Sequence, residues 1–187
     1  MADRVLLVYQ TSEGHTAEVA ERIAAILRAG TDEVTLTPVH DAPDNLAGYD
    51  GVVVGGSIHF AKYDSHLTKY AKQHAAELNR LPSAFFTVCM RAAEGQGDED
   101  PEVQSYLYGF TKETHWRPDI TAVFGGELAY TKYGMIKRLV MRHIASNSGL
   151  STDTKHDHDY TDWDAVEHFA CDVLKHVGTV SHSRARV

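Results

Sequence analysis

The stretch RVLLVYQTSEGHT, residues 4–16, decides the fold expected for this chain. Its first part, Arg4–Tyr9, is an almost continuous apolar run of the kind found in a central parallel strand, which is buried on both faces. Apolar residues then recur at helical spacing between Val19 and Leu27, and Gly30 can end that helix. The chain is therefore expected to begin with a strand, a short polar loop and a helix.

The same alternation continues to the C-terminus. Further strands are predicted at residues 33–39, 50–57, 83–90 and 119–126. Further helices are predicted at residues 65–78, 101–113, 133–145 and 162–176. Five strands separated by helices predict an α/β fold, a doubly wound five-stranded parallel sheet of order 2-1-3-4-5 with helices on both faces. We expect a single domain over residues 1–176 and a mobile tail over residues 177–187.

Composition excludes several classes of protein. The 187 residues include 26 acidic side chains against 18 Lys and Arg, and this net charge of -8 argues against general affinity for nucleic acid. The two cysteines, Cys89 and Cys171, show no spacing of a metal site, and we expect no bound metal. No apolar run approaches the roughly 20 residues needed to span a bilayer. We expect a cytoplasmic protein, either soluble or peripheral at the inner face of the cell membrane.

Three loops should meet at one end of the predicted sheet. They follow the first, third and fourth strands and read QTSEGHT, GGSIHFAKY and CMRAAEG. The first of them offers backbone N–H groups, hydroxyls and the positive end of a helix dipole, a combination that suits a phosphate monoester. The plainer interpretation is that Thr11 and Ser12 cap the helix and that Gly14 turns the chain. Neither GxxxxGK[ST] nor GxGxxG occurs there, which favours a mononucleotide over ATP or NAD.

The loop TSEGHT resembles the phosphate loop of the flavodoxin family, with Glu13 where a threonine is usual. The segments YDGVVVGGSIHFAKYDSHL, LPSAF, HWRPDITAVFGGELAY and YTDW extend the resemblance to residues 4 to about 175. They are similar to the flavodoxin-type, menaquinone-dependent protoporphyrinogen oxidases. One departure is the acidic loop EGQGDEDPE, where a basic segment is expected. This resemblance implies an FMN-dependent oxidoreductase of haem biosynthesis that passes electrons from a tetrapyrrole to a membrane quinone.

The resemblance also implies which residues hold the flavin. The phosphate would be bound by Thr11, Ser12, Glu13, Gly14, His15 and Thr16. The isoalloxazine edge would be lined by Gly55, Gly56, Ser57, Ile58, His59 and Phe60, with Cys89, Met90 and Arg91 following the fourth strand. Adjacent glycines let a backbone approach a planar ring closely and present a peptide group to flavin N5. Phe60 or Tyr63 could stack on the ring or pack on the next helix, and no side chain stands out as a catalytic acid or base.

Residues 130–145, YTKYGMIKRLVMRHIA, predict a basic amphipathic helix. Lys137, Arg138 and Arg142 fall on the face opposite its apolar residues. Such a helix either lies on an anionic membrane surface or packs on the sheet with a solvated outer face. Lys62, Arg91, Lys132 and Lys137 are candidates for attracting porphyrin propionates or lipid head groups.

A second function remains open on this sequence. The acidic loop favours a soluble flavodoxin-type electron carrier, which docks protein partners through an acidic surface. A flavin-binding sensor or scaffold has no specific support. Two other features have plain interpretations: Cys89 is expected to be a small buried hydrophobe, and the run KHDHDY is expected to be solvated.

Overall fold

The computed structural model describes residues 3–59, 61–94, 97–132, 134, 139, 141–142, 145–146 and 150–184. The strands are β1 (Arg4–Tyr9), β2 (Glu33–Pro38), β3 (Gly51–Ser57), β4 (Ser83–Cys89), β5 (Ile120–Gly125), β6 (Glu127–Leu128) and β7 (His158–Asp159). The α-helices are α1 (His15–Arg28), α2 (Ser65–Gln73), α3 (Ala75–Leu78), α4 (Pro101–Thr114) and α6 (Trp163–Arg184). Short 3-10 helices are η1 (Val39–Asp41), η2 (Met90–Glu94) and η3 (Gly97–Glu99).

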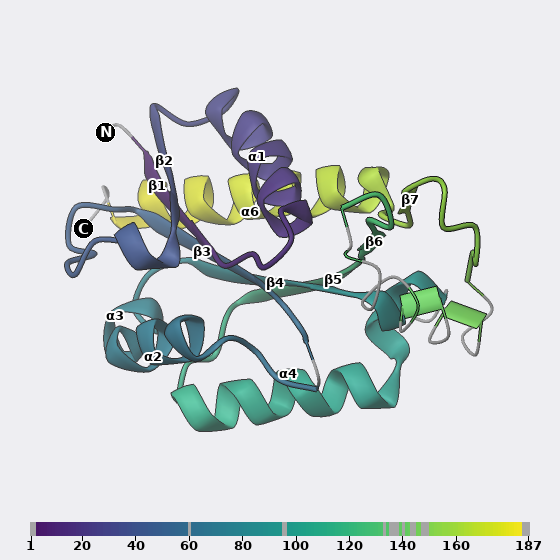
Figure 1. Ribbon diagram of the computed structural model, residues 1–187. Coiled ribbons are helices and arrows are strands. Elements are labelled where there is room, and N and C mark those ends of the chain that lie inside the picture. Colours follow the sequence, from purple (N-terminus) through teal and green to yellow (C-terminus); the bar gives the residue numbers. More distant parts are fainter. Residues whose placement is uncertain are drawn as a thin grey trace.

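The main sheet has the predicted topology. Its five strands are all parallel and lie in the order β2-β1-β3-β4-β5. Leu7 of the central β1 is in register with Leu36 on one side and Val53 on the other. Helices α1 and α6 cover one face of the sheet, and α2, α3 and α4 cover the opposite face (Figure 1). The predicted doubly wound fold is therefore confirmed.

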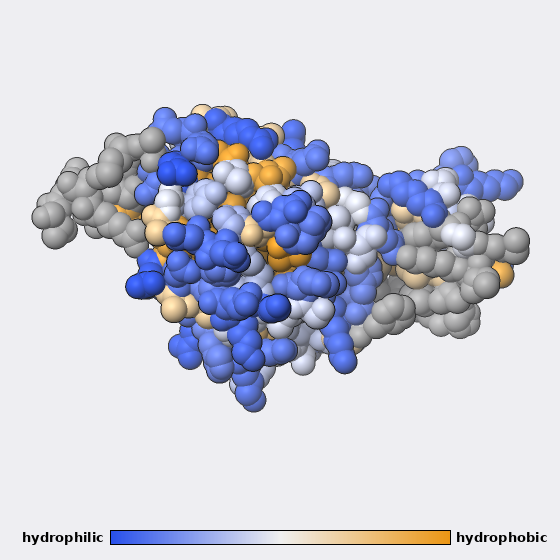
Figure 2. All heavy atoms as spheres, turned by 60° about the vertical axis from the view of Figure 1, so that its left-hand side comes forward, coloured by the Kyte–Doolittle hydropathy of each residue, from blue (hydrophilic) through white to orange (hydrophobic). Residues whose placement is uncertain are grey.

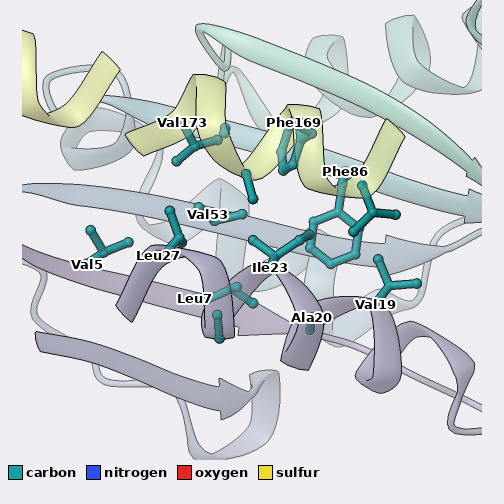
Figure 3. Close-up of a cluster of buried hydrophobic side chains, with 14 of the residues drawn as sticks. Val5, Leu7, Val19, Ala20, Ile23, Leu27, Val53, Phe86, Phe169 and Val173 are labelled. Carbon is teal, nitrogen blue, oxygen red and sulfur yellow. The ribbon is translucent and has the colours of Figure 1, made fainter. Parts of the chain in front are cut away.

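Both faces of the sheet carry a hydrophobic core, as the apolar run in β1 requires. Val5 and Leu7 point toward α1 and α6, whereas Leu6 and Val8 point toward α2 and α4, and all four are fully buried. Figure 3 shows the first core, in which side chains of α1 meet Phe169 and Val173 of α6 over the sheet. Burial of an apolar side chain of this size stabilises the fold by about 1.5–3 kcal/mol.

The C-terminal helix is longer than predicted. The sequence predicted a helix ending at His176 and a mobile tail from residue 177, but α6 continues to Arg184. Val177 extends the apolar stripe of α6 by one turn and is 1% exposed, packed where Gly51 begins β3. The predicted helix end at residue 176 is therefore too early, because Val177 still packs on the core, whereas the predicted mobility of the tail stays a prediction.

Two other helix predictions also need comment. The helix expected over residues 65–78 is interrupted at His74, whose ring packs on Tyr70 and whose Nδ1 lies 3.0 Å from Glu77 Oε2. The basic helix expected over residues 133–145 lies largely outside the described residues, including Lys137 and Arg138.

A second, two-stranded sheet was not predicted. β6 and β7 are antiparallel, with Glu127 opposite Asp159 and Leu128 opposite His158. In Figure 1 they lie beyond the end of the main sheet, close to the start of α1. Strands of two residues carry no detectable periodicity, so hydrophobic patterning could not predict them.

The surface agrees with the acidic, hydrophilic composition. The face that Figure 2 turns toward the reader is mostly hydrophilic, and its hydrophobic residues are exposed only in small patches. Among the residues that the structure describes, no helix combines the length and the apolar character needed to cross a bilayer.

Candidate functional site

The carboxyl ends of β1, β3 and β4 surround a cavity of about 160 Å³. Predicted flavin-site residues that line it are Thr11, Ser12, Glu13, His15, Thr16, Ser57, Ile58, His59, Cys89 and Met90. Val88, Gly126, Glu127 and Met141 complete the lining. The three loops expected to converge therefore do so around one cavity, at the position where doubly wound sheets bind their ligands.

The first of these loops connects β1 to the N-terminus of helix α1 through a tight turn at Gly14. Gly14 precedes α1 with a φ of 102°, a backbone conformation that residues other than glycine adopt only under strain. Its N–H donates to Thr11 Oγ1 at 2.9 Å, which closes the turn. Among the described residues, no side chain makes a capping hydrogen bond at the N-terminus of the 14-residue helix α1, although Glu18 lies in its first turn. The first N–H groups of the helix are therefore left for a ligand at the cavity.

His15 connects this loop to a distant part of the chain. The Thr161 hydroxyl donates to the Gly125 carbonyl at 3.0 Å, so it accepts at 2.6 Å from His15 Nε2. The other ring nitrogen, Nδ1, is buried and forms no hydrogen bond within the described part of the chain; Glu18 Oε2 lies 3.7 Å and Glu127 Oε2 3.9 Å from it. The His15 side chain is only 8% exposed, so its position is fixed by packing and by Thr161.

Ser57 provides a second buried polar atom at the same cavity. It ends β3, is 7% exposed, and its Oγ forms no hydrogen bond with any residue that the structure describes. Buried polar atoms are nearly always hydrogen-bonded, and an unpartnered one costs about 1–3 kcal/mol. Two such atoms, Ser57 Oγ and His15 Nδ1, therefore mark the cavity as a place where a polar ligand completes the structure. The uncapped helix fits a flavin phosphate. The Ser57 hydroxyl, which can donate or accept, and His15 Nδ1, which accepts when Nε2 carries the proton of the neutral ring, fit a polar ring edge.

Other predicted flavin-site residues lie elsewhere. Gly55 and Gly56 are inside β3, and both are close-packed by the core. A Cβ on Gly55 would lie 1.9 Å from Phe86 Cζ, and one on Gly56 would lie 2.3 Å from Leu67 Cδ2. Core packing thus explains this glycine pair without the flavin. Phe60 lies outside the described residues.

Tyr63 takes the second of its two predicted positions. Its ring packs on Phe85 and Phe110, and its hydroxyl shares a 2.8 Å hydrogen bond with Thr87 Oγ1. Burial raises the pKa of Tyr63 well above its usual value. Tyr63 is therefore a core residue below the β3–α2 loop.

Cys89 and Arg91 also have structural partners. Cys89 is buried at the end of β4, and burial raises the pKa of its thiol, as expected of a small buried hydrophobe. Arg91 Nε lies 2.9 Å from Asp100 Oδ2 and 3.2 Å from Glu102 Oε2. Burial alone would raise the pKa of Asp100. The hydrogen bonds that its carboxylate accepts from the backbone N–H groups of Glu102 and Val103 and from Arg91 instead hold this pKa below its usual value.

The predicted substrate or membrane cations are dispersed. Lys62 lies in the β3–α2 loop, where its backbone pairs with that of His59. Lys132 is exposed, with Nζ 3.5 Å from Glu127 Oε2, and Arg142 is exposed in a helical turn. Sequence reasoning missed Glu127 and Thr161, although the GGELAY and YTDW segments that carry them had been noted for their resemblance.

Comparison with known proteins identifies the family. A flavodoxin-domain model matches residues 6–155, and the chain belongs to the flavodoxin family. It is 34% identical to a protein named protoporphyrinogen IX dehydrogenase [quinone] from Escherichia coli over 171 residues, which cover 91% of this chain and 94% of that protein. A protein of the same name from Leishmania major is 33% identical over 90% of this chain and 74% of its own length. Among solved structures, flavodoxin 1 from Bacillus cereus has the same fold, with a TM-score of 0.58 over 93% of this chain and 99% of its own, at 15% identity.

Proposed function

We propose that this chain is an FMN-dependent oxidoreductase that oxidises protoporphyrinogen and passes the electrons to a quinone. The observation that carries the proposal is the cavity where an uncapped helix, His15 Nδ1 and Ser57 Oγ await polar partners. Two relatives that share a third of their residues with this chain over nine-tenths of its length are named for this reaction.

In this proposal, each loop around the cavity contacts a different part of the flavin. The loop Thr11–Thr16 would bind the phosphate through backbone N–H groups, hydroxyls and the dipole of α1. Ser57 and the loop after it would contact the polar edge of the ring, while Cys89 and Met90 would border it from β4. The bound flavin would supply the redox chemistry, and the protein would orient it and exclude water. No aromatic residue occurs in Cys89–Arg91, which leaves the outer side of the site open to a planar substrate.

The cofactor is tested by extraction and by reduction. Cofactor released from the purified protein should co-migrate with FMN on chromatography, and anaerobic addition of protoporphyrinogen should bleach its visible absorbance. Release of FAD would contradict the monoester assignment. An FMN-loaded protein that stays oxidised in the presence of protoporphyrinogen would contradict the substrate assignment.

A soluble electron carrier is the competing function, and the acidic loop after β4 is the observation that favours it. In the structure, however, part of this loop is neutralised internally, because Asp100 and Glu102 both lie within 3.2 Å of Arg91 Nε. These carboxylates are therefore less available to a protein partner. A carrier would exchange electrons with a reductase or ferredoxin and leave protoporphyrinogen unchanged, so the reduction experiment separates the two functions.

We also propose that the protein works peripherally at the cytoplasmic face of a membrane, where its quinone resides. Leu139, 61% exposed, and the exposed Arg142 lie in the described part of the basic amphipathic segment. An apolar side chain beside cations suits an anionic lipid surface, and each near-surface cation contributes about 1 kcal/mol. Co-sedimentation with anionic vesicles should occur at low salt and decline as salt is added. Equal binding to neutral vesicles, or none to either, would contradict this placement.

A further inference from the structure

A second depression lies beside the flavin site and has no assigned role. It is a groove of about 600 Å³ between α2 and α4, on the sheet face opposite α1 and α6 (Figure 1). Its mouth includes Lys62, whose backbone pairs with that of His59 at 3.0 and 3.1 Å, and His59 lines the flavin cavity. The groove and the cavity therefore share the β3–α2 loop.

The groove is cationic on an acidic protein. Lys62, Lys69 and Lys72 line it, and Glu113 is the carboxylate among its lining residues. Lys69 and Lys72 are one helical turn apart on α2, so both face the same side. Within the part of the chain that the structure describes, these three lysines form no ion pair. Three cations without partners near one another repel, and this arrangement favours binding of an anion.

The floor and far wall of the groove are suited to an apolar body. Tyr63 and Phe110 are among its lining residues, with ring centroids 4.7 Å apart. Gly109 sits in the middle of α4, where a glycine weakens a helix, and a Cβ placed on it would meet nothing within 4 Å. Packing therefore does not require this glycine, but a larger side chain there would narrow the groove.

We propose that the α2–α4 groove binds the carboxylates of the tetrapyrrole substrate, with Lys62, Lys69 and Lys72 as specificity-determining residues. This inference rests on the proposed function. A porphyrinogen pairs an extended apolar macrocycle with two propionate carboxylates, and the groove pairs an aromatic floor with three cations. Propionates held there would leave the macrocycle at the shared β3–α2 loop, next to the flavin. The lysines act in binding and touch no reacting atom, so they affect substrate affinity and not the chemical step.

The test compares two substrates on two variants of the FMN-loaded protein. The groove variant carries Lys62→Gln, Lys69→Gln and Lys72→Gln, and the charge-matched control carries Lys112→Gln, Lys155→Gln and Lys175→Gln. The substrates are protoporphyrinogen and its dimethyl ester, in the same detergent. Loss of three exposed charge contacts should raise KM for the diacid about 5- to 30-fold in the groove variant, with kcat unchanged and with no change for the ester. The control should behave like the wild type.

A binding measurement and a neutral substitution complete the test. Fluorescence titration with protoporphyrin should show the same preference for the diacid in the wild type and its loss in the groove variant. Gly109→Leu should raise KM for both substrates because it fills the groove, whereas Gly109→Ala should not.

The outcomes separate this inference from the function on which it rests. If the wild type oxidises protoporphyrinogen and the groove variant keeps its KM for the diacid, or loses diacid and ester alike, the groove inference is wrong and the proposed function stands. If the wild type oxidises neither substrate, both fall. If the groove variant loses binding to anionic vesicles but keeps its porphyrin affinity, the lysines bind lipid head groups and the inference is also overturned.

Discussion

Replacing Ser57 with alanine should have opposite effects on the empty and the flavin-loaded protein. The Ser57 hydroxyl is buried at the end of β3 and has no hydrogen-bond partner among the described residues. An unsatisfied buried hydroxyl costs about 1–3 kcal/mol, so its removal should stabilise the apoprotein by about 1 kcal/mol. If the flavin supplies the missing partner, the same change removes one hydrogen bond from the complex, worth about 0.5–1.5 kcal/mol.

These two terms add when FMN binds. The dissociation constant should rise by about 10- to 70-fold, which corresponds to about 1.5–2.5 kcal/mol. Urea unfolding of the apoprotein gives the first quantity, and quenching of FMN fluorescence during titration gives the second. Ser65→Ala, an exposed position on α2, serves as the matched control. The reasoning is refuted if the apoprotein loses stability, or if the FMN dissociation constant is unchanged in a folded variant.

Three further predictions concern stability. Gly55→Ala should destabilise the protein by about 1–3 kcal/mol because its Cβ would overlap the Phe86 ring, and Phe86→Leu should recover part of that loss; an additive double variant would argue against the overlap. Tyr63→Phe should cost about 1–3 kcal/mol by leaving the Thr87 hydroxyl buried and unpaired, and adding Thr87→Val should restore most of it, as chemical denaturation can measure. Because the pKa of Asp100 is lowered on folding, its stabilisation is present above the unfolded value near about 4 and is lost as pH falls below it. Asp100→Asn should therefore flatten the acid limb of the stability curve, and an unchanged limb would count against the assignment.

The main sheet could be predicted from the sequence because its inner strands, β1, β3 and β4, are six or seven residues long and largely buried. The run in β1 is apolar on both faces, which only a central strand requires, and alternation with helices then restricts the topology. The interruption of the helix at His74 could not be predicted, since it depends on contacts with Tyr70 and Glu77 that periodicity does not report. The end of α6 was misjudged because Val177 has polar neighbours in sequence, although it meets Gly51 in space.

In the candidate site, too, the sequence predicted the loops but not the contacts between distant residues. Motif and topology located the loops that form the cavity, since the carboxyl ends of parallel strands meet at one edge. They did not find the contact between His15 and Thr161, which are 146 residues apart. They also attributed Gly55 and Gly56 to the flavin, whereas the side chains of the cross-strand neighbour Phe86 and of Leu67 on α2 occupy the space that a Cβ at these positions would take. Gly56→Pro is accordingly an unsuitable probe of the flavin, because it would disrupt β3 itself.

The central claim is that the FMN-loaded protein oxidises a porphyrinogen and passes the electrons to a quinone. The most direct measurement is to mix the purified, FMN-loaded protein with protoporphyrinogen under strict exclusion of oxygen, and to follow porphyrin fluorescence with and without a soluble menaquinone analogue. We expect little porphyrin without the quinone and continuous formation with it, at a rate that depends on the amount of protein. Porphyrin formation that is no faster than in a protein-free control, while the same protein is readily reduced and reoxidised by redox proteins, would contradict the account and identify an electron carrier.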